Sequence, residues 1–549
     1  MAGVLFTPAP WRLLTDTALW SETWPGIPHP LRGEIRTKFT NCALCPAGCA
    51  VRARCVGDQP VSLAGVRGGL CPFGIGAHQL PYHPARLKQG PIEEATDAVA
   101  RRANQGIAIL DLNPGRTASW TYRRAMHALN GVYLSETQPY AIDLHAARTV
   151  VSIGVPLLDG WGTPSNVFAA RENFHLIQVD AMASRTAMAA DEWVRIAPGT
   201  ESAYARSLLQ SNSLGKDGPA VVLGDAPEIP EINRLLGAYG KTIVPRPEAP
   251  VPEAWRNTAA KITQLAEVPD HSIAVLLIDE ATATSYIPWH RIARKLVRDN
   301  PLVVTFATSR GGYARHANYA LPVAVYPEVI DDIPPAIDRV TPTFKLSVPL
   351  IAPPQGMATL PEFAATLSGI QSATALRDRA TEIFKTPQGT LLTYADGKET
   401  PVKDLTLDTF WTALNSGSEY VGWASWPVPA GSQPPPPAYR PDPSPESEPG
   451  LPLIAIAQPW APAGSPLMTK LYQESNLRLA PNRIALSPAD ARAAGVRDGA
   501  HAILQTRLGK CAVQVTIDAA VPPGAVQVGA SPGIQDVCPH SARAKVVSA

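Results

Sequence analysis

Four cysteines near the start of the 549-residue chain constrain its fold more than any other feature. They are Cys42, Cys45, Cys49 and Cys71, in the spacing C-x2-C-x3-C-x21-C. Five of the seven cysteines fall within the first 71 residues, whereas cysteines that merely pack in a core would be scattered. Three soft thiolate ligands in one tight loop, with a fourth further on, are typical of a [4Fe–4S] site. The sequence therefore predicts an iron–sulfur domain around these residues.

Two other interpretations of the cysteines stay open. A structural zinc site with four thiolates is one, although such sites more often combine two separated C-x2-4-C pairs and only one is present. A disulfide framework is the other, but large chains seldom need one and no secretory signal indicates an oxidising compartment. Cys55 lies outside the spacing, and Cys511 and Cys538 lie far downstream, so we interpret all three as core or surface residues.

The composition is that of a large globular protein. Hydrophobic residues make up 45% of the chain and charged residues 17%, which is enough apolar content for several packed domains. The net charge of +1 gives no reason to expect a nucleic-acid partner. No run approaches the roughly 18 apolar residues of a membrane-spanning helix, so we expect no direct membrane span.

The amino terminus bears on location. Residues 1–20 lack the basic start, apolar core and twin arginines of an export signal. We therefore expect the protein in the cytoplasm or peripheral on the membrane, and in the periplasm only if a partner carries it there.

Short apolar runs alternate with helical patterns through the middle of the chain. The strand candidates are 106–112, 149–154, 176–179, 220–224, 272–278 and 302–306. Residues 117–129 have the pattern of a helix. This alternation predicts an α/β fold, in which helices cover both faces of a parallel sheet and ligands bind at the carboxyl ends of its strands.

Proline marks the last domain boundary. Eleven of the 57 prolines fall in residues 426–452, which cannot form a helix and are typical of an extended linker. Downstream, β-rich runs frame a predicted turn at Gly509–Lys510, and 490–495 is a predicted helical insert, which together indicate a small β-barrel. The predicted parts are an extension over 1–34, the iron–sulfur domain over 35–90, trimmed α/β domains over 91–425, the linker over 426–452 and the barrel over 453–549.

Four segments of the chain, in the same order, resemble the molybdopterin oxidoreductase family. Residues 41–49 and 69–74, with the tail 82–88, resemble its amino-terminal iron–sulfur domain. Residues 175–201 resemble its strand-end segment with pterin-dinucleotide contacts. Residues 314–322 with Glu328 resemble its "A-D-x-x-L-P…E" signature, and residues 484–533 resemble its carboxy-terminal β-barrel. The resemblance implies that family's fold, with Rossmann-like parallel-sheet domains between the iron–sulfur domain and the barrel.

The resemblance also implies a cofactor and its contacts. Members of the family hold molybdenum or tungsten on molybdopterin guanine dinucleotide. The positions that match the family's contacts are Asp180, Thr186, Asp191, Thr200 and Glu201. Asp180 stands at a predicted strand end, where its carboxylate would accept hydrogen bonds from a ribose or guanine. Helix capping and loop stabilisation are the alternative roles for these residues.

Within the family, residues 151–164 look like the large subunit of alternative complex III and related quinone reductases, several of which keep the fold and lack molybdenum. Other departures point the same way. The segment 134–140, where a metal ligand is expected, contains no cysteine. Its Ser135 is a candidate ligand under the catalytic alternative, although we interpret it as a turn or cap residue. Phe73 stands where the family often has Lys or Arg, and Asn318 where it more often has Asp.

Two functional hypotheses follow. In the first, the chain is an iron–sulfur electron-transfer subunit of a membrane-associated respiratory redox complex, with a ferredoxin-like Fe–S subunit and a quinone-reactive membrane subunit as partners. In the second, it is a catalytic molybdenum or tungsten bis-pterin oxidoreductase that acts on a small inorganic or one-carbon substrate. A zinc-stapled scaffold without redox activity is a third hypothesis.

Overall fold

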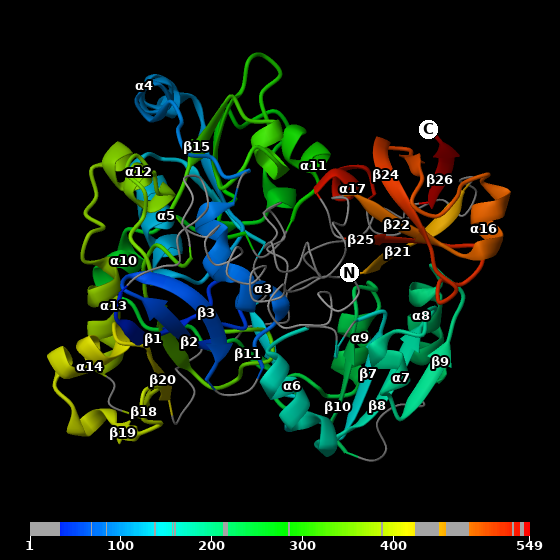
Figure 1. Cartoon of the computed structure of the whole chain (residues 1–549), viewed down its shortest axis with the longest axis horizontal. Coiled ribbons are helices and arrows are strands. Elements are labelled where there is room, and N and C mark those ends of the chain that lie inside the picture. The colour runs from blue at the N-terminus through cyan, green and yellow to red at the C-terminus, as the bar shows by residue number, and fades with distance from the viewer. Residues whose placement is uncertain are drawn as a thin grey trace, which may run out of the picture.

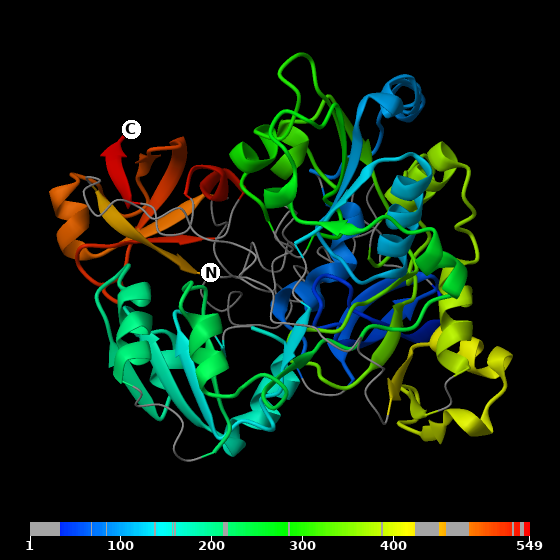
Figure 2. The ribbon, with the colours of Figure 1, turned by 180° about the vertical axis from the view of Figure 1, so that it is seen from behind.

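The computed structural model describes most of the chain. The described residues are 33–66, 69–83, 85–136, 139–155, 157–158, 161–211, 218–283, 286–324, 326–385, 388–422, 450–456, 482–529, 532–538 and 543–549. They form five main units, namely a small antiparallel sheet, two parallel sheets, a larger antiparallel sheet and a barrel. The barrel lies beside the smaller parallel sheet on one side of the molecule, and the other three units lie together on the opposite side (Figures 1 and 2).

The first unit carries the cysteines. It consists of the antiparallel strands β1 (Ile35–Asn41), β2 (Ala50–Val56) and β3 (Gln59–Gly65), followed by helix α3 (Pro72–Gly76) and the 3-10 helix η1 (Ala77–Tyr82). Strand β2 alternates buried and exposed residues, which is the pattern of a strand with one face toward a core. The buried face of this sheet packs behind the cysteine loop and includes Val51, Ala53 and Leu63.

The larger parallel sheet is assembled from two separated stretches of the chain. Its order is β12 (Ile262–Thr263), β5 (Val132–Leu134), β4 (Ile107–Asp111), β13 (Val275–Asp279), β14 (Leu302–Ala307) and β15 (Tyr319–Pro322). One face packs against α4 (Ile92–Arg102), α5 (Thr117–Ala128) and α12 (Leu360–Ser368), and the other against α11 (Trp289–Ala293). Every residue of β4, β13 and β14 is buried, as expected for central strands covered on both faces.

The smaller parallel sheet is inserted between those two stretches. Its order is β10 (Ala220–Leu223), β7 (Thr149–Ile153), β8 (His175–Asp180) and β9 (Glu192–Arg195). Helix α6 (Pro164–Ala170) packs on one face, and α8 (Glu201–Ser211) and α9 (Ile229–Leu235) pack on the other. The short helix α7 (Arg185–Met188) connects β8 to β9, and a two-stranded ribbon of β6 (Tyr140–Ile142) and β11 (Ile243–Pro245) leads into and out of the unit. The predicted α/β fold is confirmed.

A five-stranded antiparallel sheet follows the larger parallel sheet, and the sequence patterns above do not predict it. Its order is β16 (Asp331–Asp332), β17 (Thr343–Ser347), β20 (Ser418–Gly422), β18 (Gly389–Thr393) and β19 (Glu399–Pro401), with helices α13 (Ala375–Phe384) and α14 (Leu407–Leu414) against it. The remaining short elements are η2 (Ala103–Gln105), η3 (Arg171–Asn173), α10 (Glu253–Asn257), η4 (Leu265–Glu267), η5 (Gly312–Arg315) and η6 (Val402–Asp404).

The carboxy-terminal unit is a closed barrel, as predicted. Its order is β21 (Leu451–Ile456), β25 (Val526–Gly529), β22 (Arg483–Leu486), β24 (Gly509–Ile517), β23 (His501–Thr506) and β26 (Arg543–Ser548), with helices α16 (Pro488–Ala493) and α17 (Pro532–Val537). The hairpin turn lies at residues 507–508, so the turn predicted at Gly509–Lys510 is wrong by two residues. The Thr506 hydroxyl accepts the Leu508 N–H, which places the turn before Gly509.

Most of the predicted proline-rich linker lies outside the described residues, which resume at residue 450. Strand β21 begins at Leu451, within the range predicted as linker, and pairs with β25 and β26. Across the described residues, every helix is too short or too polar to traverse a bilayer.

Candidate functional site

Three of the four cysteines lie on one loop between β1 and β2. The Cys42 N–H donates to the Cys49 carbonyl over 2.9 Å and closes the loop, and the Gly48 N–H donates to the Cys45 carbonyl over 3.2 Å. Gly48 has a φ of +55°, a left-handed conformation that strains residues with a side chain. The fourth, Cys71, caps the amino end of α3, where its Sγ accepts the Gly74 N–H over 3.4 Å.

The four thiols are close enough to act on one another. Burial, followed by the neighbouring Cys49 and Cys71, raises the pKa of Cys45 to about 12. Burial, followed by Cys45, raises the pKa of Cys42 well above its usual value, with smaller effects from Cys49 and Cys71. Buried thiols that oppose one another's ionisation need a positive partner to become thiolates, and a metal centre supplies that charge.

A buried tyrosine faces the same space. Tyr326 is in the apolar cluster behind the cysteines, and its hydroxyl has no hydrogen-bond partner among the described residues. Burial raises the pKa of Tyr326, and Cys42, Cys49 and Cys71 raise it further. An unpaired buried hydroxyl costs about 1–3 kcal/mol, so its position beside the thiols points to a bound group that accepts a hydrogen bond there.

The donor set of this pocket fits an iron–sulfur cluster. Among the described residues, no three Cys, His, Asp or Glu side chains converge on a point where they could hold a single metal ion. A [4Fe–4S] cluster takes its four thiolates on separate irons, so its ligands surround a larger volume.

Two of the predicted pterin contacts come together at the smaller parallel sheet. Asp180 ends β8, and its carboxylate accepts the Met182 N–H over 3.1 Å and the Ser184 hydroxyl over 3.2 Å. Glu201 begins α8, and its Cγ lies 3.8 Å from where a Cβ on Gly154 would stand, just beyond β7. Burial raises the pKa of both carboxyls, and Asp180 adds to the rise at Glu201. Two acids thus line the carboxyl edge of this sheet.

The other three predicted contacts form hydrogen bonds within the protein. The Thr186 hydroxyl accepts the Leu158 N–H over 3.0 Å, on the same carboxyl side, and the Thr200 hydroxyl donates to the Ala197 carbonyl within its own turn.

Asp191 lies at the opposite, amino end of β8. Its Oδ2 accepts the Leu176 N–H over 2.7 Å and an Arg171 N–H over 2.9 Å. The structure therefore brings Asp180, Thr186 and Glu201 to one edge and leaves Asp191 at the other.

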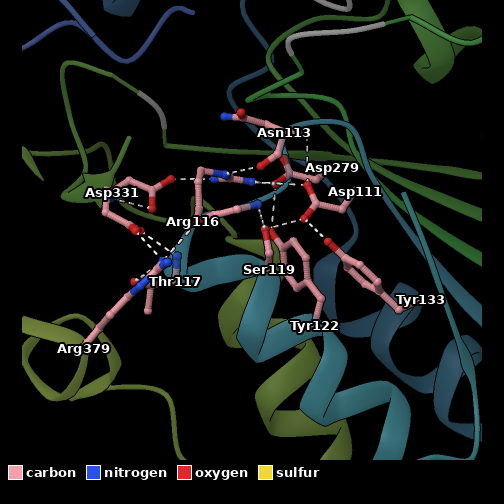
Figure 3. A network of polar contacts seen from close by, with 12 residues as sticks. Asp111, Asn113, Arg116, Thr117, Ser119, Tyr122, Tyr133, Asp279, Asp331 and Arg379 are labelled. Atoms are coloured by element: carbon pink, nitrogen blue, oxygen red, sulfur yellow. Dashed lines mark hydrogen bonds and ion pairs between the residues drawn. The ribbon is translucent and has the colours of Figure 1, made fainter. Parts of the chain in front are cut away.

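The carboxyl edge of the larger parallel sheet is filled by the chain's own side chains. Strands β4 and β13 are neighbours, and the sheet continues from them in opposite directions, so the topological switch point lies between them. Asp111 ends β4, Asp279 ends β13, and both side chains are buried. Arg116, at the start of α5, donates to Asp279 over 2.7 Å and to Asp331 over 2.5 Å (Figure 3). Open α/β sheets bind ligands in this crevice.

Hydroxyl groups complete the pairing around these acids. Asp111 accepts the Ser119 hydroxyl over 2.6 Å and the Tyr133 hydroxyl over 2.7 Å. Asp279 accepts the Tyr122 hydroxyl over 2.8 Å. Figure 3 shows these side chains pointing toward one another from β4, β5 and α5. The crevice is therefore a packed polar core.

A second buried arginine extends this network into the antiparallel sheet. Arg379 of α13 pairs with Asp332 over 2.8 Å, and Asp332 also accepts the Thr117 N–H over 2.7 Å. Four acids face two arginines in the extended network, namely Asp111, Asp279, Asp331 and Asp332 against Arg116 and Arg379. Burial outweighs Arg116 and raises the pKa of Asp331 to about 7, so protonation relieves the excess negative charge.

Comparisons with known proteins show what the chain is similar to. Residues 468–546 match the model of the Molydopterin dinucleotide binding domain. The menaquinone reductase molybdopterin-binding-like subunit of Nitratidesulfovibrio vulgaris (strain Hildenborough) is 26% identical over 257 residues, which cover 38% of this chain. Both matches support the molybdopterin oxidoreductase superfamily. The match spans only 37% of the length of that curated relative.

A solved structure of the superfamily fold agrees over almost the whole chain. Acetylene hydratase from Pelobacter acetylenicus superposes with a TM-score of 0.67 over 93% of this chain and 100% of its own, at 12% identity. At that identity the likeness shows the fold alone.

Three departures from the superfamily pattern have a place in the structure. Phe73 is buried in α3, where a phenyl ring supplies no charge. Ser135 is buried just after β5, and its N–H donates to the Thr263 carbonyl over 3.1 Å. The Asn318 side chain accepts the Val303 N–H over 2.7 Å, which fixes the start of β14 against the loop before β15.

Asp536 joins the barrel to the larger α/β unit among the described residues. Asp536 of α17 accepts the Tyr286 hydroxyl over 2.5 Å, the Trp289 N–H over 3.0 Å and an Arg315 N–H over 2.7 Å. Burial works to raise the pKa of Asp536, but hydrogen bonds from His316, Tyr286 and Trp289 outweigh it and lower that pKa. His316, which lies in the signature segment, stacks on Trp289 with 4.4 Å between ring centroids.

Sequence reasoning missed several of these residues. Tyr326 and Asp536 carry no pattern of their own, because their roles depend on elements far away in the chain. Asp111 and Asp279 did carry a signal, since each is an acid directly after a buried apolar strand. Such acids stand at the carboxyl edge of a parallel sheet and need partners there.

Proposed function

We propose that this chain is an iron–sulfur electron-transfer subunit, with the molybdopterin oxidoreductase fold, of a membrane-associated respiratory complex. Cys42, Cys45, Cys49 and Cys71 would hold one [4Fe–4S] cluster. When bound, the cluster supplies one-electron transfer. The chain would exchange electrons with a multi-cluster ferredoxin-like subunit, and through it with a quinone-reactive membrane subunit.

The cysteine pocket carries this proposal. Its four thiols influence one another and are unpaired, and the Tyr326 hydroxyl beside them has no protein partner among the described residues. The apolar cluster behind the loop, including Leu63, Leu80 and Leu350, keeps water away from one side of the pocket. A cluster held there would be shielded on that side and tied to the chain by four thiolates.

The filled crevice of the larger parallel sheet supports an electron-transfer role over catalysis. Where the fold class places its ligand, Arg116 is buried and paired with Asp279 and Asp331. A pterin bound in this crevice would have to separate Arg116 from these two acids. Breaking a buried ion pair leaves charges without partners and costs several kcal/mol. No bond-making chemistry is assigned to this chain.

A relative that is a subunit of a menaquinone reductase supports partners in a quinone-linked complex. We further propose that the chain lies in the cytoplasm or on the membrane surface, and reaches the periplasm only if exported with a partner.

One observation favours a second candidate function, that of a catalytic molybdenum or tungsten bis-pterin oxidoreductase. Residues 468–546 match a pterin-dinucleotide-binding domain, and Asp180 and Glu201 remain together at the edge of the smaller sheet. These acids would accept hydrogen bonds from a guanine or ribose if a dinucleotide bound there.

Purification of the tagged chain from its native membranes under anaerobic conditions tests the proposal. We expect it to bring down an iron–sulfur subunit and an integral membrane subunit, with menaquinol- or quinone-linked electron transfer. Isolation of the chain alone, together with turnover of a small substrate, would contradict the proposal and support the second candidate.

A further inference from the structure

A buried lysine lies directly behind the cysteine loop. Lys345 is on β17, in the middle of the antiparallel sheet, and only 4% of its surface is exposed. Its Nζ donates to the Ala47 carbonyl over 3.3 Å. A Cβ on Gly48 would lie 2.4 Å from the Lys345 Cε and 2.7 Å from its Nζ. The loop therefore has glycine at the point where the lysine passes it, between Cys45 and Cys49.

The sheet fixes the lysine in this position. Asn41, at the end of β1, donates to the Leu346 carbonyl over 2.9 Å, and the Thr40 hydroxyl pairs with both the N–H and the carbonyl of Val348. These bonds join the end of β1 to the residues that directly follow Lys345. The lysine thus belongs to a rigid part of the pocket.

The ammonium group is incompletely neutralised by the protein. Its nearest acid, Glu419 on the paired strand β20, lies 3.8 Å away, beyond hydrogen-bonding distance. Glu419 is also within 4.0 Å of Arg339 and accepts the Tyr394 hydroxyl over 3.5 Å. The Glu419 carboxylate is thus shared between Lys345 and Arg339. The charge of Lys345 beside the cysteine loop is therefore only partly neutralised.

The lysine meets the loop at Ala47 and Gly48, between the thiols of Cys45 and Cys49. A fixed cation at this position favours negative charge on the sulfurs whether or not a metal is bound.

We propose that Lys345 is a positioning residue that raises the reduction potential of the cluster, and that Glu419 partly offsets this effect. The inference rests on the proposed function, since it assumes the cluster on the four cysteines. Uptake of one electron from a donor iron–sulfur cluster adds one negative charge to the site and breaks no bond. A buried cation stabilises that added charge, so Lys345 raises the potential, and Glu419 lowers it by partly neutralising the lysine.

The test is an anaerobic redox titration of the purified chain, with iron content and the iron–sulfur signal measured in every sample. Lys345→Met should shift the ratio of reduced to oxidised cluster at a fixed potential about tenfold toward oxidised, or about 59 mV for one electron. Glu419→Gln should shift it in the opposite direction by a smaller factor. Lys345→Arg, which keeps the charge, and Lys398→Met, at an exposed site, should titrate like the wild type.

The outcomes separate the two proposals. Opposite shifts in the lysine and glutamate variants support the inference, because damage to the fold would move both the same way. Equal midpoints in all variants that retain the cluster would overturn it and leave the proposed function intact. If Lys345→Met fails to hold iron, an unshifted Glu419→Gln midpoint overturns the inference. A wild-type chain without the cluster would overturn the proposed function itself.

Discussion

Arg86 and Glu328, 242 residues apart in the sequence, form a buried ion pair with two parallel hydrogen bonds. The Nη1–Oε1 and Nη2–Oε2 distances are both 2.5 Å. Arg86 follows the cysteine-bearing unit, and Glu328 follows the signature segment of the larger parallel sheet. A planar guanidinium suits such a two-point contact. The pair fixes the cysteine pocket against the α/β core.

Loss of the Glu328 charge should therefore destabilise the protein. We expect Glu328→Gln to lower the free energy of unfolding by about 3–5 kcal/mol, because the buried Arg86 is left without its charged partner. Asp408→Asn, in the exposed pair with Arg377, should cost less than about 1 kcal/mol. Denaturant unfolding of both variants checks this, and equal losses would contradict a special role for the buried pair.

The ligand assignment has a matched control within the same domain. Cys45→Ala should abolish the iron–sulfur signal and most electron transfer, because a cubane needs all four thiolates to be held in this loop. Cys55→Ala should keep the signal, since Cys55 lies on β2, where burial raises the pKa of its thiol and the charged groups that act on it are Lys38 and Asp58. Iron analysis and electron paramagnetic resonance compare the two. A full signal in Cys45→Ala would show that the assignment is wrong.

Glu280 should make stability depend on pH in a defined direction. It follows β13, is buried and accepts the Tyr313 and Ala314 N–H groups over 2.9 and 3.1 Å. Burial raises its pKa from 4.5 to about 8. A raised pKa means that the folded state binds the proton more tightly. The stabilising contribution is therefore complete below about pH 4.5 and is lost as the pH rises through about 8.

The variant Glu280→Gln isolates this effect. Between pH 5 and 8, the unfolding free energy of the wild type should fall relative to that of the variant, with a slope of at most about 1.4 kcal/mol per pH unit. Denaturant unfolding at several pH values measures the difference. Parallel pH profiles for the two proteins would contradict the prediction.

The contact between α17 and the α/β unit should decide how firmly the barrel closes. Asp536→Asn weakens charge-assisted hydrogen bonds worth about 1.5–3 kcal/mol each, so we expect faster tryptic cleavage of the native protein around the barrel. Asp498→Asn, whose acid accepts only the Ile517 N–H within the barrel, is the control. Because the pKa of Asp536 is lowered, its contribution is present above the usual carboxyl pKa and is lost below it. Equal cleavage rates in the two variants would show that the Asp536 contact does not hold the barrel against the α/β unit.

Local patterns predicted the strands and helices that are uniform in character. The apolar runs at β4 and β14 became buried central strands, and the helix predicted at 117–129 is α5. The five-stranded antiparallel sheet escaped prediction because its strands mix polar and apolar residues, even where the strand is buried. Strand β17, with the sequence TFKLS, is buried throughout and includes Lys345.

The site was predictable where its residues are neighbours in sequence. The cysteine spacing alone groups the thiols, whereas the network around Arg116 joins residues from β4, α5, β13 and β16 that no spacing connects. The larger parallel sheet is also discontinuous, with the smaller sheet inserted between β5 and β12. Long-range pairing of this kind depends on tertiary packing and leaves no local pattern.

We propose that this chain carries an iron–sulfur cluster and no catalytic metal. Elemental analysis of the anaerobically purified chain, counting iron, molybdenum, tungsten and zinc in one sample, tests it most directly. We predict about four irons per chain, the content of one [4Fe–4S] cluster, without molybdenum or tungsten. Four irons with one molybdenum or tungsten would contradict the electron-transfer assignment in favour of catalysis, and zinc without iron would contradict both.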